Sequence, residues 1–259
     1  IIKMNEHNVF AYLEWRGDLT FDREPFNEVD NLILSMISFL DFSGIAEERE
    51  IGIMDAVKEV EKAGVSRRYF GALIPDATFD LAKCAAATPR FREARVCAFQ
   101  NIIDEDAVMQ FAAVTFLLPD DSIFVAFRGT DDTLVGWKED CNLSYIEVPA
   151  QQCATAYLQA IAAHYPGGIR IGGHSKGGNL ALWAAVHVPR EVRDRILSAQ
   201  SNDGPGFSTQ VLEMPEFTEL GDRLLTLIPQ SSVVGVLLER GNRYEIIHST
   251  QQAVMQHDP

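Results

Sequence analysis

The run Ile-Arg-Ile-Gly-Gly-His-Ser-Lys-Gly-Gly-Asn-Leu, at residues 169–180, places a serine where it could act as a nucleophile. Ser175 stands in a G-x-S-x-G pattern, with Gly173 two residues before it and Gly177 two residues after it. An apolar β-branched run precedes the pattern and an Ala/Leu-rich run follows it, as at a sharp strand-to-helix turn that exposes a serine hydroxyl. The glycines leave room for that turn. The alternative is a glycine-rich turn in which Ser175 merely caps the helix.

The second chemical signal is the run Ile-Phe-Val-Ala-Phe-Arg-Gly-Thr at 123–130. It is typical of a buried strand that ends in a loop at Thr130. A serine that attacks a carbonyl carbon needs backbone N–H groups that stabilise the oxyanion. The N–H groups of Thr130 and of Lys176, the residue after the serine, are the predicted donors. For Thr130 the alternative is an ordinary turn. His174 is expected to be a structural neighbour of the serine, because adjacent residues at such a turn point in different directions.

These motifs resemble the class 3 (fungal) lipase pattern of the α/β-hydrolase superfamily. The resemblance rests on the runs at 127–130 and 173–178, together with Trp137 and Asp140 between them. Four further runs look like a bacterial branch of these lipase-like hydrolases, at 12–19, 25–30, 202–207 and 256–259. The resemblance implies an α/β-hydrolase fold and a Ser-His-Asp hydrolase that acts on esters without a metal or another cofactor. It says little about the substrate, because one fold hosts many functions.

The acid of the triad does not stand where this fold usually places it. The acid usually follows the strand predicted at 223–228, but here no carboxylate follows that strand before Glu239, which departs from the class 3 pattern. Asp203 follows the preceding strand, predicted at 195–199, and would lie at the same edge of the sheet; pancreatic-type lipases look similar in this respect. Asp203 is therefore the predicted acid, and Asp222 is a weaker candidate because it precedes its strand. The alternative is that the Asp-Gly-Pro-Gly run is simply a turn.

The base is sought among the histidines that follow Asp203, which are His248 and His257. His257 fits the family pattern and the loop after the last predicted strand, so it is the predicted base. It lies two residues before the end of the sequence, where fraying is expected. His248 is the alternative, at or near the end of that strand. The remaining histidines are expected at the surface: His7, His164 and His187.

Together these residues predict a serine esterase or lipase-like carboxylic ester hydrolase that works through an acyl-enzyme. The expected partner is a small-molecule ester or a lipid-like substrate. A thioesterase, an amidase or an acyltransferase would use the same triad. A non-catalytic α/β-hydrolase scaffold is the alternative of another class, and the missing acid at the usual position keeps it open.

Alternating helix and strand patterns indicate how these residues are held. Helical periodicity is predicted at 25–41, 51–63, 76–88, 151–164 and 178–188. Strands are predicted at 95–103, 107–118, 122–127, 169–173, 195–199, 223–228 and 244–248. Strands that alternate with helices predict a mostly parallel sheet flanked by helices. We expect one α/β domain over 1–259, with a helical N-terminal cover at 1–94 and the catalytic sheet at 95–259. The run at 205–220 is expected to be either a lid or a core-packing insertion.

Composition excludes several other functions. The 37 acidic residues exceed the 22 basic ones, for a formal net charge of -15, so nucleic acid and anionic membrane surfaces are poor partners. No apolar run is long enough for a transmembrane helix, and the first residues do not resemble a signal peptide. The four cysteines form no C-x-x-C pair, which predicts neither a metal site nor a disulfide scaffold. Reduced cysteines in a cytoplasmic protein are the expectation.

Overall fold

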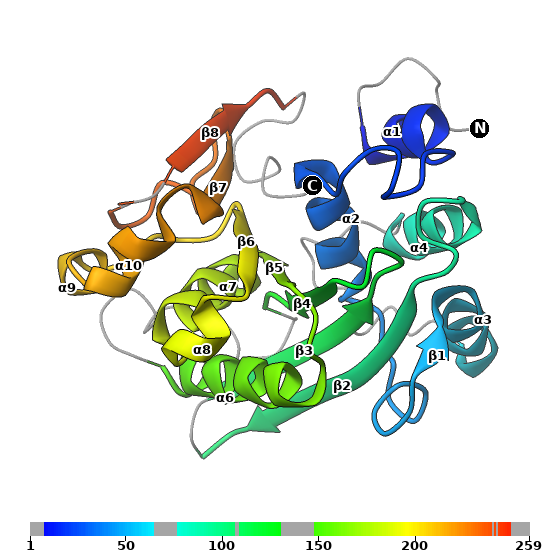
Figure 1. The fold of residues 1–259 in the computed structure, drawn as a ribbon, viewed down its shortest axis with the longest axis horizontal. Coiled ribbons are helices and arrows are strands. Elements are labelled where there is room, and N and C mark those ends of the chain that lie inside the picture. The colour runs from blue at the N-terminus through cyan, green and yellow to red at the C-terminus, as the bar shows by residue number, and fades with distance from the viewer. Residues whose placement is uncertain are drawn as a thin grey trace.

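The centre of the protein is an eight-stranded sheet whose strands lie side by side in chain order. A computed structural model describes residues 8–64, 77–106, 109–130, 148–239, 241 and 243–249. The strands are β1 (Ile51–Gly52), β2 (Arg95–Asp104), β3 (Met109–Leu117), β4 (Ile123–Phe127), β5 (Ile169–His174), β6 (Ile196–Asn202), β7 (Leu224–Pro229) and β8 (Arg243–Ile247). Figure 1 shows the sheet running from β8 at one end to β2 and β1 at the other.

The sheet changes direction at β4. From β1 to β4 neighbouring strands are antiparallel, and from β4 to β8 they are parallel. Strands β4 and β7 are buried along their whole length, which explains their continuous apolar sequences. The carboxyl ends of the parallel strands meet at one edge of the sheet, where α/β proteins place their sites. The predicted fold class, a mostly parallel sheet flanked by helices as in α/β-hydrolases, is confirmed.

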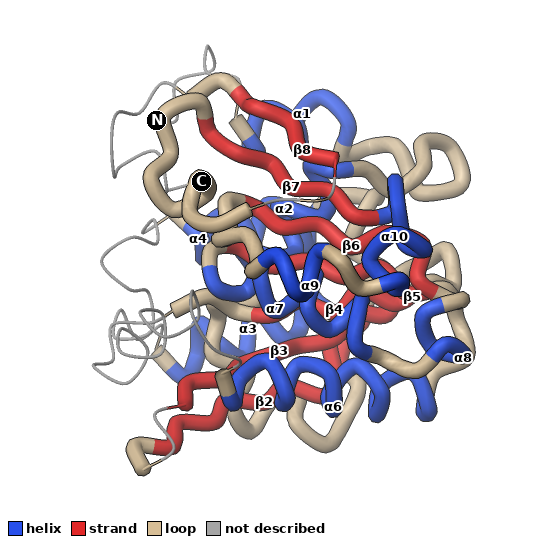
Figure 2. Tube along the Cα trace, turned by 90° about the vertical axis from the view of Figure 1, so that its left-hand side faces the viewer, coloured by secondary structure: helices blue, strands red, loops and turns tan. Residues whose placement is uncertain are grey.

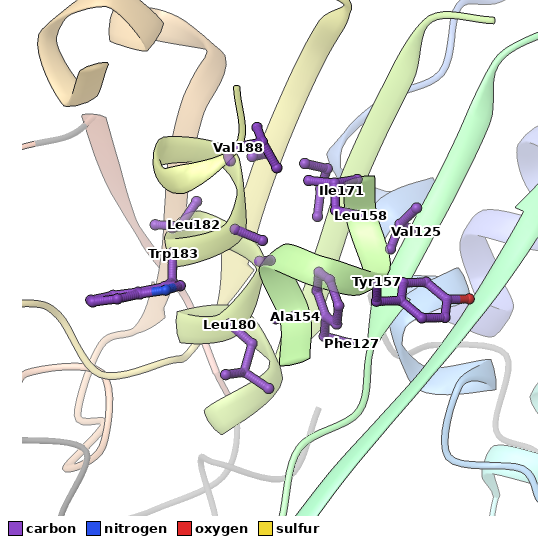
Figure 3. Close-up of a cluster of buried hydrophobic side chains, with 14 of the residues drawn as sticks. Val125, Phe127, Ala154, Tyr157, Leu158, Ile171, Leu180, Leu182, Trp183 and Val188 are labelled. Atoms are coloured by element: carbon purple, nitrogen blue, oxygen red, sulfur yellow. The ribbon is translucent and has the colours of Figure 1, made fainter. Parts of the chain in front are cut away.

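Helices cover both faces of the sheet (Figure 1; a side view in Figure 2). Helices α2 (Glu28–Ile37), α3 (Ile53–Ala63) and α4 (Thr78–Ala87) contribute to one apolar core, and α6 (Pro149–His164) and α7 (Lys176–His187) to the other. The second core is drawn in Figure 3, where Leu158, Leu180 and Trp183 come from the helices and Val125 and Ile171 from the strands. The shorter elements are α1 (Val9–Arg16), α8 (Arg190–Arg193), α9 (Thr209–Leu212), α10 (Pro215–Leu220) and the 3-10 helix η2 (Gly221–Arg223).

Helix α2 is fixed by a buried ion pair. Asn27 caps the helix and forms a capping box with Asp30. Asp30 also accepts from Arg90 Nε at 2.7 Å, and both side chains are fully buried. Arg90 donates in addition to the carbonyls of Leu19, Glu24 and Pro25. This arginine therefore ties α2, and the turns before it, to the segment that leads into β2.

Each predicted helix and strand overlaps an observed one, with shifted ends. The prediction at 51–63 begins with the two-residue strand β1, and β6 extends to Asn202 rather than ending at 199. The run at 205–220 contributes Phe207, Phe217 and Leu220 to the core beside α7, as expected of a packing insertion. The division of the chain at residue 94 into a cover and a catalytic core stays a prediction.

Candidate active site

Ser175 lies at the turn between β5 and α7 in a backbone conformation that only a few residues adopt. Its φ is 58° and its ψ is -129°. Such a left-handed conformation costs a non-glycine residue on the order of 1–3 kcal/mol and persists only where the surroundings enforce it. The strand-turn-helix context and the strained serine are the two features of a nucleophile elbow. Ser175 is partly exposed, so its side chain is not wholly covered by protein.

The carbonyl of Phe127, at the end of β4, explains the glycines on both sides of Ser175. A Cβ atom on Gly177 would lie 2.1 Å from that oxygen, and one on Gly173 would lie 2.6 Å from it. A Cβ on Gly173 would also lie 2.3 Å from the carbonyl oxygen of Gly177. Both approaches are closer than any side chain permits. The elbow can therefore pack directly against the end of β4 only with glycine at both positions.

The loop after β4 lies against the elbow, as the oxyanion prediction requires. A Cβ on Gly129 would lie 3.3 Å from the Cβ of Ser175 and 2.7 Å from the carbonyl oxygen of His174. Thr130 is the next residue along this loop and is partly buried. Lys176 opens helix α7 directly after Ser175. The structure thus places Gly129, the residue before Thr130, against Ser175. The two N–H groups as oxyanion donors stay a prediction.

The side chain of Lys176 points in another direction from its backbone N–H. It is buried, and Nζ donates to the carbonyl oxygen and to Oε1 of Gln110 on β3, at 2.8 and 2.7 Å. The ammonium therefore links the first turn of α7 to β3, two strands away from β5. The role predicted for this residue concerns its N–H alone and does not need the side chain.

Asn202, the residue that precedes the predicted acid, is hydrogen-bonded to the elbow. Its carbonyl accepts from Ser175 N at 2.9 Å, and its Nδ2 donates to the carbonyl of Gly173 at 3.2 Å. The same amide reaches Asn31 Oδ1 at 3.3 Å, and Asn31 Nδ2 donates to the carbonyl of Ile171. Helix α2 thus supports β5 and β6 from the face opposite α7. Because His174 and Asn202 are in register, Ser175 and Asp203 begin adjacent strand-end loops.

Asp203 is buried and turns its carboxylate toward the loop that follows β7. Its backbone N–H donates to the carbonyl of Leu227 on β7 at 2.9 Å, and its φ is 54°. Ser232 Oγ lies 2.6 Å from Oδ1 and 2.8 Å from Oδ2 of this carboxylate. Gly235 N donates to Ser232 Oγ at 2.9 Å, which leaves the hydroxyl proton for Asp203. The carboxylate of the predicted acid, which follows β6, is therefore held at the loop where the fold usually carries its acid.

Four of the six histidines lie among the described residues, namely His164, His174, His187 and His248. His174 is buried against Phe39, with ring centroids 6.3 Å apart. His164 and His187 end α6 and α7, and His187 stacks on Trp183. His248 is exposed and follows β8, whose end lies at the same edge of the sheet as the ends of β5, β6 and β7. It stays the alternative to His257.

The predicted base lies elsewhere in the sequence. His257 is outside the described residues, as are Trp137 and Asp140 of the family resemblance, and His7. The placement of His257 therefore stays a prediction. Asp222 lies in η2, ahead of β7 and thus at the edge of the sheet away from Ser175, as predicted for a weaker candidate.

Comparison with known protein families shows the family of the chain. The family described as Mbeg1-like matches residues 85–259, which cover β2 to β8 and every predicted site residue. The chain belongs to the Mbeg1-like family. This Mbeg1-like chain matches no curated protein sequence.

Solved structures similar to the Mbeg1-like chain include fungal lipases. The lipase from Rhizopus microsporus var. chinensis is 12% identical, with 80% of this chain and 69% of that chain covered and a TM-score of 0.47. Lipase II from Rhizopus niveus is 14% identical, with coverages of 78% and 74% and a TM-score of 0.42. The Rhizomucor miehei lipase propeptide complex is 15% identical, with coverages of 59% and 53% and a TM-score of 0.43. The chain thus matches about half of the Rhizomucor miehei chain, and similarity at this level says nothing of its own reaction.

Other kinds of site find no support in the described part of the Mbeg1-like chain. Within it, no group of three or more histidine, cysteine or carboxylate side chains could hold a metal ion. Cys84, Cys97 and Cys153 form no disulfide in the described part of the chain, and burial raises the pKa of Cys97. No helix among these residues is long and apolar enough to span a membrane.

Sequence reasoning missed Ser232, which contacts the predicted acid directly. Its signal was its position: it lies three residues after β7, on the loop where a carboxylate is usual in this fold. A polar residue at that place indicates a hydrogen-bond donor that holds the predicted acid and does not replace it.

Proposed function

We propose that this protein is a serine hydrolase that cleaves carboxylic esters through a Ser175–His257–Asp203 triad and an acyl-enzyme. The observation that carries the proposal is the backbone of Ser175, a strained non-glycine residue at a strand-to-helix turn that is packed against the loop of Thr130. Strain of this kind is retained where it serves a site. The buried Asp203, on the neighbouring loop, supports the same reaction.

Acylation begins with proton transfer. His257 takes the proton of Ser175 Oγ as the oxygen forms a bond to the carbonyl carbon of the ester. The carbonyl oxygen becomes an oxyanion that accepts from the N–H groups of Thr130 and Lys176. Asp203 stabilises the imidazolium and fixes its tautomer. Collapse of the tetrahedral intermediate breaks the carbon–oxygen bond of the ester, and the imidazolium protonates the leaving alcohol.

Deacylation repeats these steps with water. His257 takes a proton from water, which attacks the acyl carbonyl and forms a second oxyanion in the same position. The carbon–oxygen bond to Ser175 then breaks, the serine recovers its proton from the imidazolium, and the carboxylic acid leaves. No group other than the triad, the two N–H donors and water takes part.

The substrate class follows from charge as well as from the triad. A chain with a net charge of -15 is repelled by anionic lipid surfaces. We therefore propose small or amphiphilic esters rather than lipids packed in an anionic membrane as substrates.

Hydrolysis of a p-nitrophenyl ester series, from acetyl to palmitoyl, tests the proposal. We expect turnover by the full chain and a loss of at least about 10³-fold in Ser175→Ala. Ser208→Ala is the matched control, because Ser208 is exposed and lies ahead of α9. Parallel assays with an acyl thioester, an acyl anilide and an alcohol acceptor separate esterase from thioesterase, amidase and acyltransferase activity. Ester turnover that survives in Ser175→Ala contradicts the proposal, and so does a folded wild-type chain without any acyl transfer.

A further inference from the structure

Asn179 connects helix α7, which begins after Ser175, to the loop of the predicted acid. It is on α7, four residues after Ser175, and is buried. Its Nδ2 donates to the carbonyl of Pro205 at 3.2 Å and to the carbonyl of Gly206 at 3.0 Å. Both carbonyls belong to the short run that follows Asp203. One amide nitrogen thus holds the acid loop to the first turns of α7.

The orientation of the Asn179 amide is set by its other neighbour. Gln151, on α6 and also buried, donates from Nε2 to Asn179 Oδ1 at 2.9 Å. Gln151 Oε1 in turn accepts from the backbone N–H of Val148 at 3.0 Å. With Oδ1 occupied by a donor, the two hydrogens of Asn179 Nδ2 point at the two carbonyls of the acid loop. The glutamine therefore fixes which way the asparagine faces.

The loop that follows Asp203 packs closely on α7, so the position of the loop depends on its contacts with this helix. A Cβ on Gly204 would lie 2.6 Å from the carbonyl oxygen of Ser175 and 2.9 Å from the backbone nitrogen of Asn179. On its other side the loop is held by hydrogen bonds from Gly206 N to the carbonyl of Leu237 and from Phe207 N to the carbonyl of Glu239. The loop is thus clamped between α7 and the segment that also carries Ser232.

We infer that Asn179 is a positioning residue that sets the distance between Ser175 and Asp203, and that Gln151 orients it. This inference rests on the proposed function, since it assigns a role within the same triad. Asn179 touches neither substrate nor reacting atoms. It acts through the loop that carries the acid. It therefore affects how well Asp203 stabilises the imidazolium that forms when Ser175 loses its proton.

The substitution Asn179→Asp tests this directly, because it keeps the shape and replaces two N–H donors with an oxygen that repels both carbonyls. We expect kcat for ester hydrolysis to fall at least about tenfold while KM stays within about twofold. We also expect the acidic limb of kcat/KM against pH to move to lower pH, because a displaced acid stabilises the imidazolium less. A purely structural role would change the amount of folded protein without moving that limb.

A second variant covers the possibility that Asn179→Asp does not fold. Gln151→Ala leaves the Asn179 amide in place and frees it to turn, so a smaller decrease in kcat and the same direction of the pH shift are expected. The matched control is Gln152→Ala, since Gln152 is the exposed neighbour on α6. The inference is overturned if folded Asn179→Asp, or else Gln151→Ala, retains the kcat and pH profile of an active wild-type chain. A wild-type chain without ester turnover and without labelling of Ser175 by a fluorophosphonate overturns the proposed function as well.

Discussion

Ser232 Oγ donates to the carboxylate of Asp203, 2.6 Å from one oxygen and 2.8 Å from the other, although the two residues follow different strands. Asp203 directly follows β6, and Ser232 lies on the loop after β7. The contact resolves an apparent gap in the sequence, where the loop after β7 carries no acid. In the proposed triad the carboxylate follows the preceding strand, and this loop contributes the hydroxyl that holds it.

Removal of that hydroxyl should weaken catalysis without removing the acid. A hydrogen bond to a charged group is worth about 1.5–3 kcal/mol, which corresponds to roughly 10- to 100-fold in rate if it is lost in the transition state. We therefore predict that Ser232→Ala lowers kcat/KM for a p-nitrophenyl ester by about that factor. Ser231→Ala is the matched control, because Ser231 is the exposed neighbour. Equal activity of the two variants would show that the contact does not orient the acid.

Gly235 should tolerate no side chain, because its backbone packs on the same carboxylate. A Cβ at this position would lie 2.1 Å from Asp203 Oδ1 and 2.9 Å from Ile228 Cγ2. Gly235→Ala is expected to displace the acid, to lower kcat/KM at least about tenfold and to cost about 1–3 kcal/mol of unfolding free energy in urea. Gly52→Ala serves as control, since a Cβ there meets nothing within 4 Å. An active Gly235→Ala protein would place the working carboxylate elsewhere.

Asp203 itself is tested by an isosteric change. Asp203→Asn keeps the volume but removes the charge that stabilises the imidazolium, and a comparable change in a serine-protease triad lowers kcat by about 10⁴-fold. A decrease of this order in ester turnover is expected, with thermal unfolding measured to establish that the fold is retained. Asp222→Asn should leave turnover unchanged, because Asp222 precedes β7 at the other edge of the sheet. Full activity in Asp203→Asn would reassign the acid.

The buried pair of Asp30 and Arg90 predicts a large effect on stability. Asp30→Asn leaves a fully buried guanidinium without its counter-charge, which costs about 3–5 kcal/mol. The measurement is the free energy of unfolding in urea. Asp55→Asn is the control, because Asp55 forms an exposed pair with Lys58 that is worth less than about 1 kcal/mol. Similar unfolding free energies for the two variants would contradict this account of how α2 is anchored.

Local patterns in the sequence predict the parts of the site that depend on neighbouring residues. The elbow at Ser175 follows from a strand, a glycine pair on each side and a helix, and all of these lie within the run at 169–188. The parallel sheet follows from the alternation of apolar strands with helices. Short elements escape prediction, because the two residues of β1 and the four residues of α9 are too few to show a period.

Contacts between distant loops could not be predicted in the same way. Ser232 meets Asp203, and Gln151 meets Asn179, across 29 and 28 positions of the sequence. Each contact depends on the path of a loop between elements rather than on periodicity. Asn179 had a local signal, since it is a polar residue directly before the apolar run at 180–186, but its partners appear only in three dimensions.

Covalent labelling tests whether Ser175 is an activated nucleophile. The full chain is treated with a fluorophosphonate, and the modified residue is located by mass spectrometry of its peptides. We expect one phosphonyl group on Ser175 of the folded protein, none on Ser175→Ala, and slower labelling of Asp203→Asn. A folded wild-type chain that remains unlabelled at Ser175, or that is labelled equally at exposed Ser208, would contradict it.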